Sequence, residues 1–189
     1  MLLKKWEQDL EKSQKIFSEN VIPVLKTIGF NGDYLPIEKV HPNELEKSFD
    51  AHSGIDIWFV QLDKGMRGIA SRVQMIKNGY RPYNTFTIRL KRCTGSKTEF
   101  EKRLYAIENE WLYPFYTLQA YVKEELNEVL SLAICKTEEL YKIAESQKEM
   151  KIKINSEDSN QFIVIGWDEF NENDIRVWQN PFMAEAIKV

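Results

Sequence analysis

Asp56 is the residue of this 189-residue chain whose type and position point most directly to chemistry. It opens the apolar segment 54–61, and Trp58 falls on the same side of a β-strand, because side chains alternate between the two faces. An acid on a partly covered face needs a partner, either an arginine or a metal ion. The next apolar segment, 67–75, carries Arg72 and Gln74 on one side. The sequence therefore predicts that Asp56 has a polar partner on the adjacent strand or a bound cation.

A third segment, 85–91, alternates in the same way, with an apolar side that includes Phe86 and Ile88 and a polar side that includes Thr87 and Arg89. If the three strands pair as an antiparallel meander, their polar side collects Asp56, Arg72, Gln74, Thr87 and Arg89. A solvated sheet face produces the same pattern. The alternation alone leaves both interpretations open.

Positive charge is concentrated around these strands. From Gly65 to Lys97 the chain has eight Lys or Arg and no Asp or Glu, although its net charge is −3. This asymmetry favours a phosphate-rich ligand, and we expect nucleic acid to bind through a local basic face. Interleaved Tyr80 and Tyr83 could stack on bases. The expected nucleic-acid contacts are Arg67, Arg89, Lys91, Arg92, Lys97 and Lys102.

A helix bearing acids is expected just before Asp56, with Asn43 as its N-cap and Glu46 among its acids. This helix, the Gly54-Ile55-Asp56 motif and the hairpin that follows resemble the core of the PD-(D/E)XK nucleases over about residues 43–92. The resemblance implies that Asp56 and Glu46 hold Mg²⁺ and that metal-assisted hydrolysis of a phosphodiester follows. Glu44 or Asp50 could substitute for Glu46.

The sequence departs from that family where an acid and a lysine, spaced E-x-K, should follow. Arg72 stands in the place of the acid and Gln74 in the place of the lysine. The resemblance then implies that Gln74 completes the metal site through its carbonyl and that Arg72 or Arg89 stabilises charge on the phosphate. Two hypotheses follow. The first is a divergent nuclease-like protein that cuts or only binds nucleic acid. The second is a non-enzymatic interaction or inhibitor protein, for example a phage or mobile-element counter-defence factor that binds a host protein.

Other candidate residues have simpler explanations. Thr98-Glu99-Phe100-Glu101 is a capping box, and a plain capped helix over 98–112 is favoured over a phosphate site at its N-terminus. His41 and His52 are more often bystanders than proton carriers in such loops. The aromatic run that includes Trp111 and Phe115 is most simply packing between a helix and a strand.

The helices and strands that must position the candidate residues can be predicted from hydrophobic periodicity and from turn and helix-breaking residues. Helix is expected over 3–28 with a break at Pro23, a loop over 30–36, and a helix from Thr137 that this residue caps. Strands are expected at 55–61, 66–75, 83–92, 115–122, 129–136, 151–155, 162–167 and 175–179. The predicted class is α+β or mixed α/β, with a central mixed sheet flanked by helices and an N-terminal helical segment.

Composition limits the class of protein. With 43% hydrophobic residues the chain is globular rather than disordered, and 26 Lys and Arg against 29 Asp and Glu exclude a strongly basic DNA-coating protein. A single domain is expected over 1–189, with a helical segment at 1–30, a nuclease-like core at 43–136 and a C-terminal helix with strands at 137–189. Cys93 and Cys135 form no zinc pattern, and no apolar run suits a signal peptide or membrane span. These features predict a cytoplasmic protein with reduced thiols.

Overall fold

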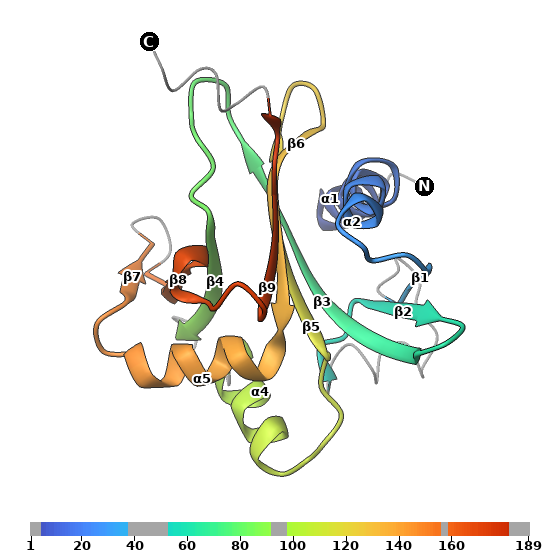
Figure 1. The fold of residues 1–189 in the computed structure, drawn as a ribbon. Helices are drawn as coiled ribbons and strands as arrows, with labels where there is room; N and C mark the ends of the chain where they lie inside the picture. Colours follow the sequence, from blue (N-terminus) through green and yellow to red (C-terminus); the bar gives the residue numbers. More distant parts are fainter. Residues whose placement is uncertain (1–4, 38–52, 92–97, 156–158, 182–189) are drawn as a thin grey trace.

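A six-stranded mixed sheet forms the centre of the structure, a computed structural model that describes residues 5–37, 53–91, 98–155 and 159–181 (Figure 1). Its strand order is β1-β2-β3-β5-β6-β9. Strands β3 and β5 are parallel, and every other neighbouring pair is antiparallel. The strands are β1 (Asp33–Pro36), β2 (Ile57–Gln61), β3 (Gly65–Ile76), β5 (Tyr116–Lys123), β6 (Glu128–Lys136) and β9 (Ile175–Gln179).

A smaller, three-stranded antiparallel sheet has the order β4-β8-β7. It consists of β4 (Thr85–Lys91), β7 (Ile152–Ile154) and β8 (Gln161–Gly166), and the 3-10 turn η2 (Trp167–Glu169) follows β8. Helices α4 (Glu99–Glu108) and α5 (Thr137–Gln147) lie on the same side of the large sheet as this small sheet (Figure 1). The architecture is α+β, as the sequence predicts.

The opposite side of the large sheet is covered by the N-terminal helical segment (Figure 1). This segment consists of α1 (Lys5–Ile16), the π-helical turn η1 (Phe17–Val21) and α2 (Ile22–Thr27). The expected break at Pro23 is wrong, because Ile16, Val21 and Ile22 all have α-helical backbone angles and the chain stays helical from α1 through η1 into α2. The π-helical turn lies just before Pro23, where the regular α-helical hydrogen-bond pattern changes without ending the helix. Val21 and Leu25 are fully buried in the core on this side, with Leu118 and Leu132 of the sheet.

A second core fills the space between the two sheets and helices α4 and α5. Phe86 and Ile88 of β4 and Ile163 and Ile165 of β8 are all buried there. Helix α4 begins at the predicted capping box, in which Thr98 accepts a hydrogen bond from the Glu101 N–H and the Glu101 side chain accepts one from the Thr98 N–H. This local signal starts the helix at a defined residue, and the helix in turn places Phe100 in the core.

Three other sequence-based expectations are wrong. Residues 30–36 are not all loop, because Asp33–Pro36 pairs with β2 as an edge strand. The third strand of the expected meander, β4, pairs with β8 in the small sheet, and the neighbour of β3 is β5. Thr137 does not cap α5: Lys136 is the N-cap residue without a side-chain cap bond, and the Thr137 hydroxyl contacts that of Thr117 at 2.9 Å. The predicted helix before Asp56 lies outside the described residues.

Candidate functional site

A polar cluster lies between the two sheets, where β3 and β5 of the large sheet meet β4 of the small one. Arg72 on β3 and Gln119 on β5 are direct neighbours in the parallel register. Thr87 on β4 joins them: Arg72 Nη1 donates to its carbonyl oxygen at 2.7 Å and to its hydroxyl at 3.0 Å. The same hydroxyl donates to Gln119 Oε1 at 3.4 Å. Thr87 and Arg72 are thus brought together as expected, but by contact between sheets.

Arg89 lies two residues after Thr87 on β4, so the two side chains are on the same side of that strand. The Arg89 and Arg72 guanidinium carbons each lie 5.6 Å from the centre of the Phe162 ring on β8, within cation–π range. The Arg89 Nε is buried and has no hydrogen-bond acceptor in the structure. Two half-buried arginines from different sheets thus share one aromatic ring.

Arg103 on α4 is also buried, with 7% of its surface exposed. Its guanidinium packs against Gly54, where an added Cβ would lie 2.5 Å from Arg103 Nη2 and where φ is +60°. Glycine suits both demands because it has no Cβ and tolerates a positive φ. Arg103 Nη1 is buried and finds no acceptor.

Tyr141 on α5 is a buried phenol within electrostatic range of both Arg103 and Arg72. Burial raises the pKa of Tyr141 well above its ordinary value, Glu99 raises it further, and both Arg103 and Arg72 oppose the shift. The phenol therefore stays protonated at neutral pH, with the two guanidinium groups within Coulombic range. Its ring stacks on Phe100 at 5.9 Å, and its hydroxyl is buried without a partner. The side-chain amide Nε2 of Gln119 is also buried and unpaired.

Among the described residues, the three arginines Arg72, Arg89 and Arg103 form no ion pair with a carboxylate, whereas Lys151 and Glu169 do so elsewhere. Burying a cation without an anion is costly, and each buried donor without an acceptor costs about 1–3 kcal/mol. A bound anion would remove these costs. This group of side chains is therefore a candidate anion-binding site, which we call the arginine cluster (Arg72, Arg89, Arg103, Gln119 and Tyr141).

Asp56 precedes β2 and has the polar partner expected on the adjacent strand. One carboxylate oxygen, Oδ2, accepts a hydrogen bond from the Ser71 backbone N–H at 2.6 Å. The Asp56 side chain thus takes the place of a backbone acceptor beside β3. The amide that it accepts from, that of Ser71, comes one residue before Arg72. An aspartate opens this strand because its short acidic side chain can satisfy a backbone amide there.

The remaining predicted site residues are distributed over several surfaces. Gln74 is half-buried and pairs in register with Tyr121 on β5. Arg67 does not join the cluster: it lies 4.9 Å from the Phe115 ring and donates to the Tyr116 hydroxyl at 3.5 Å. Lys91 and Lys102 are exposed on β4 and α4. Glu46, Arg92 and Lys97 lie outside the described residues.

Sequence reasoning missed Arg103, Gln119 and Tyr141. Two of them carry a detectable signal. Arg103 shares the buried face of α4 with Phe100 and Ala106, and Gln119 interrupts an otherwise apolar strand. A polar residue at a core position of a regular pattern is informative, because such residues are buried only when they have partners or a function. Tyr141 carries no such signal, since a buried tyrosine is common in cores.

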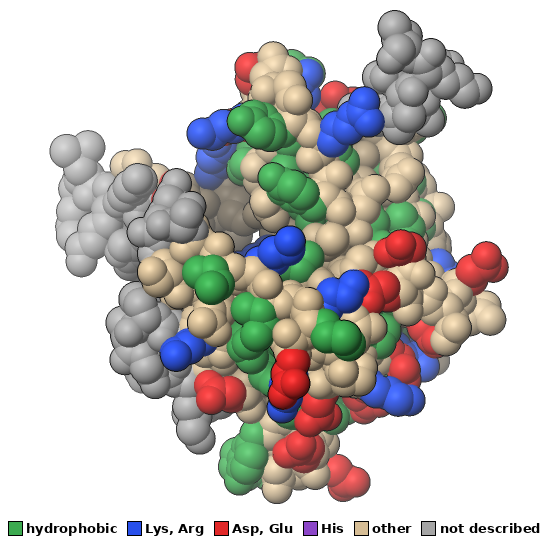
Figure 2. Space-filling model, turned by 90° about the vertical axis from the view of Figure 1, so that its left-hand side faces the viewer, with side chains coloured by type: hydrophobic (Ala, Val, Ile, Leu, Met, Phe, Trp, Pro, Cys, Tyr) green, Lys and Arg blue, Asp and Glu red, His purple; other side chains and the backbone are tan. Residues whose placement is uncertain are grey.

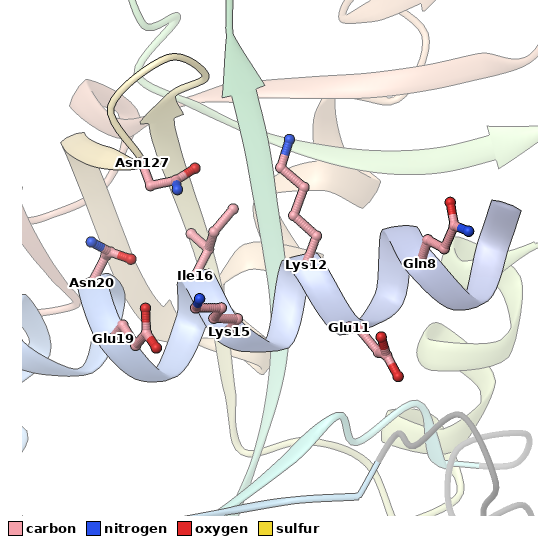
Figure 3. Close-up of a pocket in the computed structure, with 8 residues that line it drawn as sticks. All are labelled: Gln8, Glu11, Lys12, Lys15, Ile16, Glu19, Asn20 and Asn127. Carbon is pink, nitrogen blue, oxygen red and sulfur yellow. The ribbon is translucent and has the colours of Figure 1, made fainter. Parts of the chain in front are cut away.

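A surface pocket of about 420 Å³ lies apart from the cluster, between the N-terminal helical segment and Asn127 of the β5–β6 turn (Figure 3). Figure 3 shows that Lys12 and Glu11 point to opposite sides of α1. The pocket lining is Gln8, Glu11, Lys12, Lys15, Ile16, Glu19, Asn20 and Asn127. The two lysines and two glutamates of this lining cancel in charge, so the pocket favours neither an anion nor a cation.

No protein family, curated protein or solved structure matches this chain. Among the described residues, no group of three or more His, Cys, Asp or Glu side chains is placed to hold a metal ion. None of the described helices has the length and apolar character needed to cross a membrane.

Proposed function

We propose that this protein binds nucleic acid and that the arginine cluster holds a phosphate group of that ligand. The observation that carries the proposal is the set of three guanidinium groups without an ion-pair partner in the described part of the chain, two of them in contact with Phe162. Arginine is suited to this role because its planar fork of donors matches phosphate oxygens.

The surroundings favour an anion that approaches from the arginine side. Figure 2 shows acidic side chains gathered on the lower part of the molecule, at the height of α4 and α5 in Figure 1. A polyanion is repelled from that end and attracted to the segment from Gly65 to Lys97, which has eight Lys or Arg and no acid. Lys91, exposed at the end of β4, is placed to contact a neighbouring phosphate. We propose a cytoplasmic location, and Cys135 is a free, buried thiol in keeping with reducing surroundings.

The proposal has an enzymatic form, a divergent Mg²⁺-dependent phosphodiesterase or endonuclease of the PD-(D/E)XK type. Asp56 and Glu46 would hold the metal ion, which supplies an activated water and neutralises charge on the phosphate. Arg72 stands where that family places a second acid, and it is committed to the Thr87 carbonyl and hydroxyl. We therefore expect binding to persist without metal and cleavage, if present, to depend on Asp56.

Binding of single-stranded and duplex oligonucleotides in EDTA tests the first part. We expect Arg72→Met to weaken binding about tenfold and to reduce the slope of log affinity against log salt by about 1, because one phosphate contact is lost. Arg176→Met is the matched control, since Arg176 is an exposed arginine on β9 that loses the same charge. Equal losses in both variants, or no binding at all, would contradict the proposal.

Incubation with Mg²⁺ or Mn²⁺ tests the enzymatic form. Nicking of plasmid, single-stranded DNA or RNA by the intact protein and not by Asp56→Asn is the expected result. Binding without nicking in every metal would leave a nucleic-acid-binding protein that does not cut.

The second candidate is a protein–protein interaction module, favoured by exposed aromatic residues around the end of α4. Trp111 is 62% exposed and Phe115 40% exposed, although both contact neighbouring aromatic rings. Tyr105 packs edge-on against Trp111 at 5.2 Å, and Leu112 is half exposed. Exposed apolar patches of this kind commonly mark interaction sites. A Trp111→Ser variant that loses a captured partner but keeps nucleic-acid binding would support this second function.

A further inference from the structure

We propose that the surface at the C-terminal end of α4 binds a basic segment of a partner protein, with lysine or arginine side chains against its carboxylates and an apolar side chain against Trp111. This inference rests on the second candidate function, a protein–protein interaction module, and names the chemistry of its partner. The centre of the surface is the α4 patch (Tyr105, Trp111 and Leu112), whose side chains are 50%, 62% and 51% exposed.

The backbone at the end of α4 holds Trp111 in a defined position. The Trp111 N–H donates to the Ala106 carbonyl at 2.8 Å, and the Glu110 N–H donates to the Ile107 carbonyl at 3.3 Å. Glu110 itself has a φ of +55°. These are the features of a Schellman motif, in which the residue after the left-handed position packs against the last helical turn. Trp111 accordingly contacts Tyr105 edge-on, with ring centres 5.2 Å apart. The indole is therefore positioned by the fold, although most of its surface stays exposed.

Carboxylates surround this patch on α4 and on the turn that follows it. Glu101 lies four residues before Tyr105 and Glu108 three residues after it, so both share the exposed helix face of Tyr105. Glu110 is exposed in the turn. The exposed charged side chains of residues 101–112 are thus three carboxylates and one ammonium group, that of Lys102.

Helix α5 adds a further carboxylate beside the patch. Glu138 is exposed in the first turn of α5 and accepts a hydrogen bond from the hydroxyl of Tyr113, the residue that follows Leu112. Figure 2 shows acidic side chains next to a hydrophobic group at the lower end of the molecule, where α4 lies in Figure 1. The patch therefore has an apolar centre and an acidic rim.

The end of α4 is negative for a second reason. The last carbonyl groups of a helix give its C-terminus a partial negative charge, which a lysine or arginine in the last turn commonly complements. The last turn of α4 has no basic residue, and its final residue is Glu108. The left-handed position of the Schellman motif, where glycine is usual, is occupied by Glu110. The chain thus carries acids where its own stability favours a cation or glycine, and a cation from a partner would offset this charge.

These charges select among the possible occupants. A second copy that docked through the same patch would bring like carboxylates together, and nucleic acid would be repelled as a polyanion. A lysine or arginine side chain pairs with the rim and can also lie against an indole, the best ring for a cation–π contact. Tryptophan and tyrosine are the side chains that most often dominate the binding energy of an interface. A basic segment that includes an apolar side chain therefore fits both the rim and the centre.

Selection of a displayed library of random linear peptides on the intact protein tests this inference. We expect the enriched peptides to combine lysine or arginine with an apolar residue, and to bind more weakly as salt is raised. Trp111→Ser should weaken their binding at least about tenfold, because the central anchor is lost. The double variant Glu108→Lys with Glu110→Lys should weaken it to a similar extent, about tenfold or more, because like charges then face each other.

The β5–β6 turn provides matched controls, because it lies at the opposite end of the molecule from α4 (Figure 1). Leu126→Ser removes an apolar side chain that is also 62% exposed. Glu124→Lys with Glu125→Lys reverses two exposed charges. Both controls should bind the enriched peptides as tightly as the wild type does, and thermal unfolding verifies that every variant is folded.

The outcomes separate this inference from the function on which it rests. Enriched peptides that lack basic residues, and that Trp111→Ser loses but the charge-reversed α4 variant keeps, overturn the basic partner and support the interaction module. Peptides that bind Trp111→Ser as tightly as the wild type, or the absence of any enriched peptide, overturn both. Equal losses in the α4 variants and in their controls overturn the assignment to this surface.

Discussion

Replacement of Arg103 by methionine should raise the free energy of unfolding of the ligand-free protein, although Arg103 is among its most buried polar residues. The guanidinium is 7% exposed, and its Nη1 has no acceptor. A buried donor without an acceptor costs about 1–3 kcal/mol, and replacing buried charges with apolar groups of similar volume is often neutral or stabilising. Methionine keeps an unbranched apolar stem beside Phe100 and Gly54. We therefore expect a gain of about 1–3 kcal/mol.

Urea unfolding followed by circular dichroism measures this change. For a chain of this size, 1 kcal/mol corresponds to about 2–4 °C in the unfolding midpoint, so thermal scans should show a rise of about 2–12 °C. Addition of phosphate should stabilise the wild type through binding to the folded state and should have little effect on the variant. The exposed Arg176→Met serves as the control and should change stability by less than about 0.5 kcal/mol.

A loss of stability in Arg103→Met would refute the reasoning. It would mean that the guanidinium has a partner in the folded protein whose removal leaves an unpaired charge, as when one member of a buried ion pair is deleted. The arginine cluster would then be a structural network without a vacancy for an anion. A gain of stability together with loss of the phosphate effect would show that Arg103 is maintained for a ligand at a cost to the fold.

Two further predictions concern the elements around the site. Thr98→Ala should destabilise the protein by about 1 kcal/mol, because the Thr98 hydroxyl accepts a hydrogen bond from the Glu101 N–H in the capping box. Urea unfolding measures this loss. Thr27→Ala, at the end of α2, is the control and should cost less. Burial and a hydrogen bond with Glu138 raise the pKa of Tyr113 from 10.0 to about 12. The part of the free energy of unfolding that comes from this raised pKa is therefore complete below pH 10 and is lost as the pH rises toward 12. Tyr113→Phe should therefore lose less stability than the wild type between these pH values. An equal loss in both proteins would contradict the assignment.

Local patterns in the sequence were sufficient for most of the secondary structure. The capping box at Thr98 starts α4, the short loop 62–64 joins β2 to β3, alternation marks β4, and a continuous apolar run marks β6. These signals act within a few residues, so each can be recognised without knowledge of the fold. The edge strand β1 was missed because a four-residue strand at a sheet edge carries little alternation and contains a proline.

Part of the candidate site could also be predicted from the sequence. The polar faces of β3 and β4 carry Arg72, Thr87 and Arg89, and the structure brings Arg72 into contact with Thr87 and places both arginines on one ring. Arg67 lies apart from them, beside the Phe115 ring and the Tyr116 hydroxyl, because it is on the other face of β3. The partner of Asp56 was expected on the adjacent strand, and it is the Ser71 backbone amide.

The sequence by itself determined most of the described helices and strands, their apolar faces and the local excess of positive charge, because these depend on neighbours within a few residues. Only the tertiary structure decided that β4 leaves the large sheet and pairs with β8, 70 or more residues later in the chain, for example Ile88 with Ile163 and Arg89 with Phe162. That pairing places the small sheet over β3 and β5, and α4 and α5 then bring in Arg103 and Tyr141. The physical reason is that strand pairing and burial are non-local: the same alternating segment satisfies its backbone equally well beside either sheet, and the packing of the whole core selects one of them.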